Sequence, residues 1–384
     1  MSQGAELTRL RAEIRAVTLD ILRLFGKRQQ LARRIGLQKA LLGLPVENRR
    51  AEEDLRRLVS EECDRVGVRR SAGKSLLNLL LGESKRVQNE VKAASPGGVA
   101  RLERLAVVGG GGAMGILFAR YFKERGHDVA IFDIDPRRAR RAAEETGASL
   151  RSNLREAVED VELVLVSVPV EDAPRVIREI VSGTGGGSVV VEISSLKAEI
   201  IEALRGAARR GSTPLSLHPL FGPGAGTPRG QNMAVIPVVD EEKELQLASE
   251  LFPTSALFPV DAEAHDEAVG LTLGLVYYMN VGFASVLADR DPADLRSLGG
   301  PFFRLQLLLC EALISQNPGL YLSILRESEE ARLLLLKLAA KLREISTDGD
   351  LSPEAQETLR MKLAQDPDFS EAYGRIYRLQ DLLT

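Results

Sequence analysis

Cysteine, histidine and aromatic side chains are scarce in this chain of 384 residues. It has two cysteines, three histidines, no tryptophan and 4% aromatic residues. The two cysteines, Cys63 and Cys310, cannot build the disulfide framework of a small secreted domain, so we expect reduced thiols and a cytoplasmic protein. We also find no secretory signal pattern, and we expect no apolar run long enough to cross a bilayer.

A strong excess of one charge is also missing, because the formal net charge of the whole chain is −3. The charge is nevertheless uneven: residues 1–95 hold 20 Lys and Arg against 12 Asp and Glu, and residues 96–384 hold 31 against 42. The acidic segment 96–384 argues against binding of nucleic acid by the whole chain. The basic N-terminal unit could bind nucleic acid or an acidic small molecule. A chain of this length predicts two or three domains.

A glycine-rich loop follows the apolar run 105–108 and precedes a helical pattern. Its glycines fit G-x-G-x-x-G, a motif that lets backbone approach a pyrophosphate at a helix N-terminus. A second apolar run ends at Asp133, 23 residues after Gly110, where a carboxylate would meet the adenosine ribose of NAD. We therefore predict a doubly wound α/β domain that binds NAD. The cofactor contacts expected in the loop are Gly110, Gly112, Ala113, Met114 and Gly115.

Polar residues stand at the ends of three further apolar runs in this region. The run 161–168 ends in Ser167 and Val168, and Pro169 follows it. The run 189–193 is followed by Ser195 and Lys197, and the run 215–217 by His218. The carboxyl ends of parallel strands form the ligand-binding edge of such a sheet, so we expect these residues there. His218 begins a loop rich in proline and glycine and suits a proton acceptor near neutral pH. We interpret His127 as a structural residue, and His265 as intermediate between a structural and a functional residue.

An apolar seam at alternating steps of three and four predicts one helix over about residues 5–42. A helix this long cannot bury such a stripe alone, so it needs partners. Arg28 falls on the seam, and Arg11 lies 17 residues earlier, about 26 Å along a helix axis. One small ligand cannot touch both arginines of a single straight helix, so a shared ligand would require Arg11 from a second, antiparallel chain. The seam consists of Leu7, Leu10, Ile14, Val17, Ile21, Leu24, Leu31 and Ile35.

Two more helices are expected over about 48–66 and 68–92, and with the first they resemble the all-helical class of chorismate mutases. The resemblance implies an intertwined dimer that rearranges chorismate to prephenate. It rests on Arg11, Arg28, Lys39, Glu52, Ser84 and Gln88. It implies that Arg28 and the partner's Arg11 hold the substrate carboxylates, and that Ser84 also binds substrate. It implies further that Lys39 and Gln88 donate to the ether oxygen and that Glu52 holds the hydroxyl. The family usually carries arginine just before this glutamate, where this chain has Ala51.

The motifs from 109 onward resemble, in order, those of prephenate dehydrogenases, so the whole chain is similar to bifunctional chorismate mutase–prephenate dehydrogenases. The resemblance implies oxidative decarboxylation of prephenate with NAD. His218 would hydrogen-bond the ring hydroxyl, and Ser195 would orient the histidine and the cofactor. Lys197, His265 and Arg304 would bind substrate. We expect Arg304, which lies in an apolar helical stretch, to hold a carboxylate of prephenate.

The expected architecture is multidomain. An all-α, three-helix chorismate-mutase-like domain covers 1–93, a linker 94–101, a Rossmann-type doubly wound α/β domain 102–261, and an all-α dimerisation and substrate domain 262–384. Helices are expected in this last part at 266–289, 301–316, 319–345 and 366–384, with a short one from Pro353.

Alternative functions stay open at this point. The N-terminal helices could only dimerise or sense a ligand, which Ala51 favours, or they could form a nucleic-acid-binding arm. The substrate could be arogenate, and feedback by tyrosine is undecided. We expect a cytoplasmic homodimer acting on chorismate and prephenate, with no bound metal, nucleic acid or membrane.

Overall fold

The computed structural model describes residues 3–41, 46, 49–94, 102–316, 318–348, 352–366 and 369–383. Internal packing divides the chain into two compact units, which are described separately. The first comprises 1–166, 180–193 and 208–259, and the second comprises 167–179, 194–207 and 260–384.

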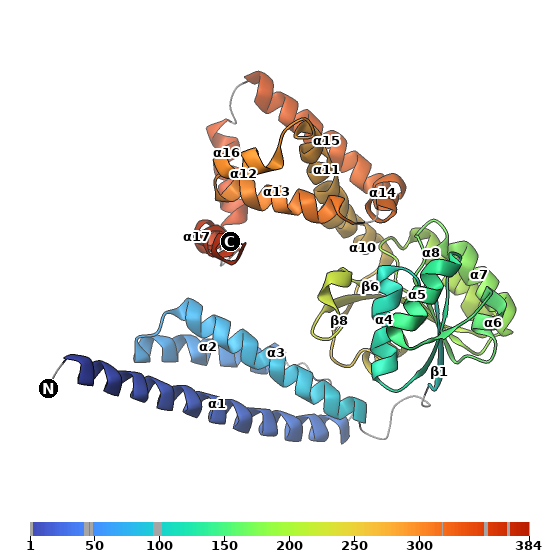
Figure 1. The fold of residues 1–384 in the computed structure, drawn as a ribbon, viewed down its shortest axis with the longest axis horizontal. Coiled ribbons are helices and arrows are strands. Elements are labelled where there is room, and N and C mark those ends of the chain that lie inside the picture. Colours follow the sequence, from blue (N-terminus) through green and yellow to red (C-terminus); the bar gives the residue numbers. More distant parts are fainter. Residues whose placement is uncertain are drawn as a thin grey trace. The chain divides into compact units, whose positions relative to one another are not determined.

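Three helices form the N-terminal part of the first unit: α1 (Gln3–Leu41), α2 (Arg49–Val66) and α3 (Arg70–Ala94) (Figure 1). The three predicted helices are confirmed, although Leu42 and Asn48, the expected end of one and start of the next, lie outside the described residues. Helix α3 contacts both of the others. A Cβ at Gly73 of α3 would lie 2.2 Å from the sulfur of Cys63, so α2 and α3 approach closely there because residue 73 is glycine.

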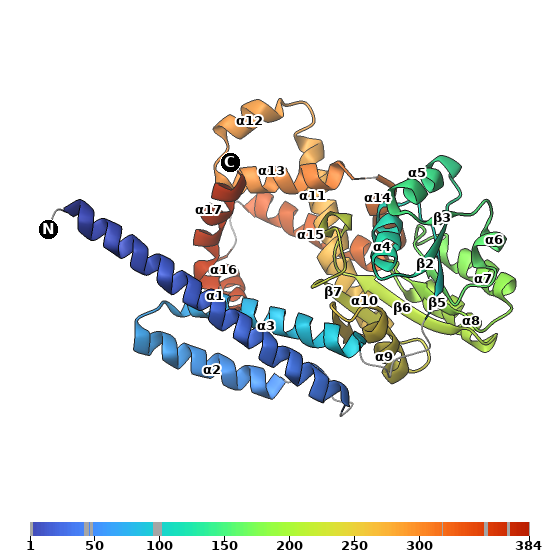
Figure 2. The ribbon, with the colours of Figure 1, turned by 60° about the horizontal axis from the view of Figure 1, so that its bottom comes forward.

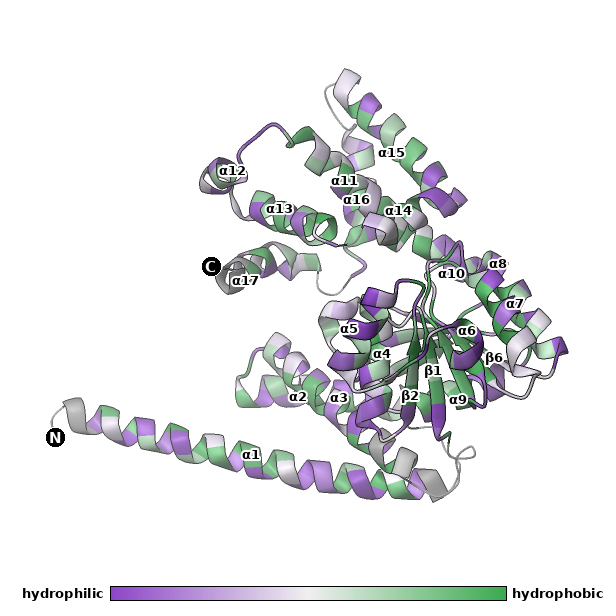
Figure 3. Cartoon of the chain, turned by 45° about the vertical axis from the view of Figure 1, so that its right-hand side comes forward, coloured by the Kyte–Doolittle hydropathy of each residue, from purple (hydrophilic) through white to green (hydrophobic). Residues whose placement is uncertain are grey.

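The apolar seam of α1 stays exposed within one chain. Leu7, Leu10, Ile14 and Leu24 have exposed fractions between 44% and 67%, whereas Ala32, which faces α3, is 3% exposed. The first turns of α1 extend beyond the ends of α2 and α3 (Figures 1 and 2). Apolar and polar residues alternate along the part of this helix that is coloured by hydropathy in Figure 3. Among the described residues of the first unit, the exposed seam of this helix therefore has no partner that covers it.

An eight-stranded sheet of order β3-β2-β1-β4-β5-β6-β7-β8 forms the rest of the first unit. All neighbouring strands are parallel except β6 and β7. The strands are β1 (Arg104–Val108), β2 (Asp128–Phe132), β3 (Ser149–Leu150), β4 (Leu163–Val166), β5 (Val189–Glu192), β6 (Thr213–Pro219), β7 (Asn232–Ile236) and β8 (Ala256–Pro259). The predicted doubly wound α/β domain is confirmed, but β7 and β8 were not foreseen.

The inner strands read as continuous apolar runs because both faces of a parallel sheet are covered. Phe118, Phe122 and Phe252 are almost fully buried and pack as a ring cluster on one face. The intervening helices are α4 (Ala113–Glu124), α5 (Pro136–Thr146), α6 (Leu154–Val158), α7 (Ala173–Thr184), α8 (Ala198–Arg209) and α9 (Glu241–Leu251), with the 3₁₀ turn η1 (Pro223–Ala225). The helix predicted from Pro136 to Thr146 has those limits.

The C-terminal part of the second unit is helical throughout the residues that the structure describes. Its helices are α10 (Ala262–Val269), α11 (Val276–Val286), α12 (Pro292–Leu298), α13 (Pro301–Ile314), α14 (Pro318–Glu327), α15 (Glu329–Asp348), α16 (Pro353–Leu363) and α17 (Ala372–Leu383), with a π-helical segment η2 (Gly270–Leu275) and a 3₁₀ turn η3 (Phe369–Glu371). The single helix predicted over 319–345 is wrong. Ser328 separates two helices, and its hydroxyl accepts a hydrogen bond from the amide of Ala331 at 3.1 Å, which starts α15.

The continuous helical run 262–286 meets the length and composition expected of a membrane-crossing helix, and 22% of its most apolar window is buried. The expectation that no apolar run is long enough is therefore wrong by this criterion, because α10, η2 and α11 join into one helix. Core helices of soluble proteins meet the same criterion. His265 and Asn280 are buried polar residues within this run.

Candidate functional site

Helices α1 and α3 bring together Arg28 and Ser84. The Nη1 group of Arg28 donates hydrogen bonds to the hydroxyl of Ser84 and to the carbonyl oxygen of Leu80. Burial of the guanidinium lowers the pKa of Arg28 from its ordinary value, and the group remains charged near neutral pH. The arginine on the predicted seam is thus held against α3 as a fixed positive charge.

Close backbone packing of α1 on α3 sets the position of Gln88. A Cβ at Gly36 would lie 2.8 Å from the Cα of Gln88, so a side chain at position 36 would push the helices apart. Gln88 is 8% exposed, and its Oε1 has no hydrogen-bond partner among the described residues. Buried polar atoms are nearly always paired in native proteins. The side-chain carbonyl oxygen of Gln88 is therefore available to accept a hydrogen bond from a ligand.

Lys39 and Glu52 belong to one charged group that also contains Lys85. Burial lowers the pKa of Lys39, while the carboxylate of Glu52 acts to raise it and the ammonium of Lys85 to lower it. Lys39 donates to the carbonyl oxygen of Val46. The Nζ atom of Lys85 lies 3.0 Å from Oε1 of Glu52. Sequence reasoning missed Lys85, because nothing in its local pattern separates it from a surface lysine.

Arg11 stays apart from these side chains. It is exposed, and it precedes Arg28 on the same continuous helix by 17 residues, which is about 26 Å at 1.5 Å per residue. The other five residues that carried the resemblance (Arg28, Lys39, Glu52, Ser84 and Gln88) lie on the three packed helices, half-buried or buried.

The glycine loop between β1 and α4 has the backbone geometry that a pyrophosphate requires. A Cβ at Gly115 would lie 2.5 Å from the carbonyl oxygen of Gly109, and one at Gly110 would lie 2.7 Å from the Ile131 side chain. Gly112 is the N-cap of α4 and gives no side-chain cap. The first amides of α4, those of Ala113 and Met114 among them, thus present an uncapped helix N-terminus, which is an anion-binding arrangement.

Asp133 lies where the sequence predicted an acid beside this loop. Its Oδ2 accepts a hydrogen bond from the amide of Gly111 at 3.0 Å, and its Oδ1 accepts one from the amide of Asp135 at 3.0 Å. The carboxylate is thereby fixed between the loop and the start of α5. These residues fit the pyrophosphate and the adenosine ribose of NAD.

His218 is 4% exposed and lies in β6, one residue before the strand ends. Ser216, two residues earlier and so on the same face of the strand, donates its hydroxyl to Oε1 of Glu192, its register partner on β5. Both Ser216 and Glu192 are fully buried. Sequence reasoning missed Glu192, although a glutamate at the end of an all-valine strand was a visible signal. His127, interpreted as structural, bonds the carbonyl oxygen of Leu102 at 2.7 Å.

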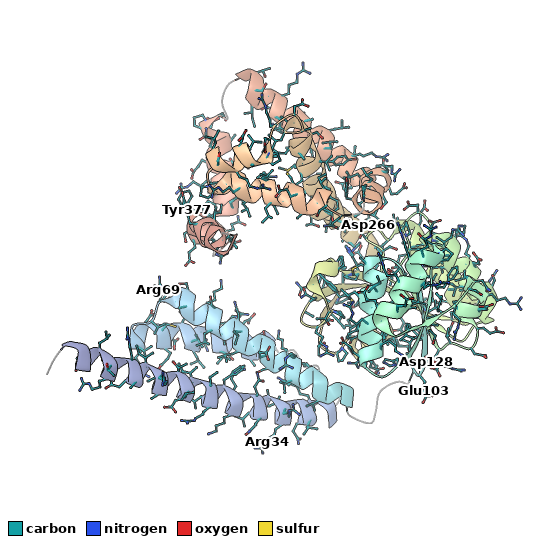
Figure 4. All side chains as sticks on the ribbon, viewed as in Figure 1. Arg34, Arg69, Glu103, Asp128, Asp266 and Tyr377 are labelled. Carbon is teal, nitrogen blue, oxygen red and sulfur yellow. The ribbon has the colours of Figure 1, made fainter. Side chains whose placement is uncertain are left out.

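The second unit joins Lys197, His265 and Asp266. The Asp266 carboxylate accepts hydrogen bonds of 3.0 Å from the amides of Lys197 and Ala198 at the start of α8. It also lies 2.8 Å from Nδ1 of His265, which is buried. The Lys197 side chain is fully buried, and Ser195 is half-buried just before it. Asp266, labelled in Figure 4, lies in α10. Asp266 therefore fixes both the loop that carries Ser195 and the ring of His265.

The remaining predicted residues also lie at element ends. Ser167 and Val168 follow β4, and the carbonyl oxygen of Pro169 accepts a hydrogen bond from the amide of Asp172 at 3.0 Å, which begins the turn into α7. Arg304, in the first turn of α13, donates from Nε to the carbonyl oxygens of Gly299 (3.0 Å) and Arg296 (3.2 Å). A bound carboxylate would therefore meet the two Nη groups of Arg304.

Comparison with known proteins assigns a family both to the N-terminal helices and to the α/β domain. Residues 10–89 match chorismate mutase type II, and residues 118–237 match the nucleotide-binding domain of prephenate dehydrogenase. The T-protein of Enterobacter agglomerans is 27% identical over 87% of this chain and 85% of its own, and that of Haemophilus influenzae is 26% identical over 86% and 84%. The chain belongs to the bifunctional chorismate mutase–prephenate dehydrogenase family. It thus joins a chorismate mutase to an NAD-dependent prephenate dehydrogenase of tyrosine biosynthesis.

Other relatives match a smaller share of this chain, and the solved structures among them have a similar fold. A probable arogenate/prephenate dehydrogenase of Methanocaldococcus jannaschii is 26% identical over 57% of this chain, and the match spans 51% of that protein. Prephenate dehydrogenase of A. aeolicus, solved with hydroxyphenyl propionate and NAD⁺, has a TM-score of 0.55 at 18% identity and covers 70% of this chain and 98% of its own. Synechocystis arogenate dehydrogenase has a TM-score of 0.53 at 18% identity, covering 69% and 99%.

Proposed function

We propose that the chain rearranges chorismate on helices α1–α3 and oxidises the resulting prephenate with the α/β part and the C-terminal helices. The observation that carries this is the arrangement of Arg28, Ser84 and Gln88 across α1 and α3, in a chain whose next domain has an uncapped glycine loop beside Asp133. The first group supplies fixed donors for a dianion, and the second fits a dinucleotide.

In the mutase step, positive charge and hydrogen-bond donors meet the charge that develops as the ether bond of chorismate breaks. Arg28 holds a substrate carboxylate, assisted by Ser84. Lys39 and Gln88 donate to the ether oxygen, where negative charge accumulates in the transition state, and Glu52 accepts from the substrate hydroxyl. Because the donors are fixed by helix packing, little reorganisation is needed during the reaction.

We infer a homodimer in which Arg11 reaches the pocket of the partner chain. The exposed apolar seam supports this, because a second antiparallel α1 would cover it and would bring the partner's Arg11 toward Arg28. Mixing Arg11→Ala chains with Arg28→Ala chains tests it. Each mixed dimer would hold one intact pocket, so random exchange should restore about a quarter of wild-type mutase activity. Recovery of none, with exchange confirmed, would contradict the shared pocket.

In the dehydrogenase step, the amides of Ala113 and Met114 would hold the pyrophosphate of NAD, and Asp133 would hold the ribose hydroxyls. Bound NAD supplies the hydride acceptor. His218 accepts the hydrogen bond of the ring hydroxyl and takes its proton as the hydride leaves the same carbon. The carboxylate on the opposite ring carbon departs as carbon dioxide, and its bonding electrons complete the aromatic ring.

The remaining predicted residues orient the substrate and the cofactor in this proposal. Ser195 would orient the nicotinamide side of NAD, which Ser167, Val168 and Pro169 would border. Arg304, Lys197 and His265 bind the substrate carboxylates, since all three carry or can carry positive charge. We take prephenate as the substrate and arogenate as the alternative. Both cysteines are free thiols, which agrees with the proposed cytoplasmic location.

The test supplies purified protein with chorismate and NAD and follows the absorbance of the reduced cofactor. Signal from chorismate requires both activities in sequence. Arg28→Ala should abolish this signal while leaving the oxidation of added prephenate unchanged. If wild-type protein oxidises prephenate but not chorismate, the N-terminal helices are only a dimerisation or regulatory module, which the alanine at position 51 favours. Arogenate, supplied in parallel, distinguishes the two substrates.

A further inference from the structure

Lys85 is a charged residue of the mutase pocket to which neither the sequence pattern nor the family assigns a role. Its Nζ atom lies 3.0 Å from the carboxylate of Glu52, and the two side chains are 32% and 21% exposed. Ser84 and Gln88, four residues apart, share one face of α3, and Lys85, three residues before Gln88, borders that face. The same face receives Arg28 from α1.

The position of this lysine coincides with a missing charge on α2. The family usually carries arginine immediately before the glutamate, and this chain has the exposed methyl group of Ala51 there. Lys85 reaches the neighbouring Glu52 from the opposite helix. It also lies within electrostatic reach of Lys39. A cation that α2 lacks is therefore present on α3.

The charge balance of the pocket supports a functional use of this cation. Without Lys85, one chain contributes a net charge of +1 to the pocket, from the positive charges of Arg28 and Lys39 and the negative charge of Glu52. With Lys85 one chain contributes a net charge of +2, and the proposed Arg11 of the partner chain would raise it to +3, a positive pocket for a substrate that carries two carboxylates. A surface ion pair would contribute little, but a partly buried cation beside a substrate dianion contributes a charge-assisted hydrogen bond.

We propose that Lys85 supplies the cation absent from position 51: its ammonium group holds Glu52 in place and binds one carboxylate of the mutase substrate. This rests on the proposed mutase function. Its effect is expected mainly in KM for chorismate, because the substrate carboxylate is present in the ground state as well as in the transition state.

The experiment replaces Lys85 by methionine, which keeps the length of the side chain and removes the charge. In the full-length protein, Lys85→Met should lower kcat/KM for chorismate roughly 10- to 100-fold, the range for losing a hydrogen bond to a charged group. Lys85→Arg should retain most of the activity. The double variant Lys85→Met/Ala51→Arg should regain at least about tenfold over Lys85→Met, since the charge returns from α2.

Arg86→Met is the matched control, because Arg86 is the next residue on α3 and pairs with Glu83 at 2.8 Å on the helix surface. It should leave mutase kinetics unchanged, and the far-UV circular dichroism of every variant, matched to wild type, reports that its helices are folded. A Lys85→Met protein with wild-type kcat/KM, or a loss that Ala51→Arg does not reverse, would overturn the role of Lys85. A wild-type protein that turns over no chorismate would instead reject the mutase function itself.

Discussion

The amide of Gly111 donates a hydrogen bond to Oδ2 of Asp133 at 3.0 Å, so the glycine loop is bound to the acid at the end of the neighbouring strand. A Cβ at Gly111 would lie 2.6 Å from Cβ of Arg138 and 2.9 Å from the same carboxylate oxygen. This contact fixes a negative charge beside the position of the adenosine ribose, and it requires glycine at position 111.

The first prediction follows from that fixed charge. Wild-type protein should prefer NAD to NADP, because Asp133 repels a 2′-phosphate. Asp133→Asn keeps the size of the side chain and removes the charge, so the ratio of kcat/KM for NAD over NADP should fall at least tenfold, about 1.4 kcal/mol. Asp135→Asn is the control, because asparagine serves equally well at the N-cap of α5. An unchanged ratio in Asp133→Asn would place the ribose elsewhere.

The second prediction concerns His218. Its ring must be neutral to accept the hydrogen bond of the substrate hydroxyl, so prephenate oxidation should decline at acid pH, where the ring takes up a proton. His218→Asn should lower kcat roughly 10²- to 10⁴-fold with little change in NAD binding. Mutase activity should survive. Near wild-type oxidation by this variant would remove His218 from the mechanism.

The third prediction uses two glycines of α1. Gly36→Ala places a Cβ 2.8 Å from the Cα of Gln88, so it should separate α1 from α3, lower mutase kcat and destabilise the helices by about 1–3 kcal/mol. Gly26 has nothing within 4 Å of the same added atom. Gly26→Ala should therefore stabilise the helix by roughly 0.5–1 kcal/mol without loss of activity. Thermal unfolding and chorismate turnover of both variants check this, and equal behaviour would contradict it.

The fourth prediction concerns the alkaline side of the mutase pH profile. Lys39 must be protonated to donate to the ether oxygen, and burial lowers its pKa. Mutase activity should therefore decline at a lower pH than a solvent-exposed lysine would dictate, because the group loses its proton earlier. Lys39→Arg should move this alkaline limb to higher pH, since a guanidinium does not deprotonate in proteins. A limb at the same pH in both proteins would assign it to another group.

The sequence predicted the parts of the fold that local periodicity encodes. The strand before the glycine loop, the helix that starts at Pro136 and the three N-terminal helices follow from apolar spacing and end signals within about 20 residues. Strand β7 was missed although its residues 233–236 form a buried apolar run like those of the predicted strands. Strand β8 is mostly exposed and ends in a proline, so it has no clear apolar pattern.

Side chains whose role depends on distant partners were also missed. The pairing of Lys85 with Glu52 joins residues on different helices, and that of Glu192 with Ser216 joins neighbouring strands. Neither pair has a local signature, because the partners are 33 and 24 residues apart in the sequence. Only the packing of the elements brings such charges and hydroxyls together.

The hydrogen bonds of Asp266 determine where the chain can be truncated without disturbing the fold of the nucleotide-binding part. Its carboxylate caps the start of α8 from a position 69 residues further along, after the boundary predicted at 261 and 262. A protein that stops at that boundary would lose this cap, leaving the amides of Lys197 and Ala198 without their acceptor beside Ser195. The nucleotide-binding part would then keep its sheet but not the conformation of the loop that carries Ser195. The domain boundary predicted from the sequence is therefore not a suitable site for truncation.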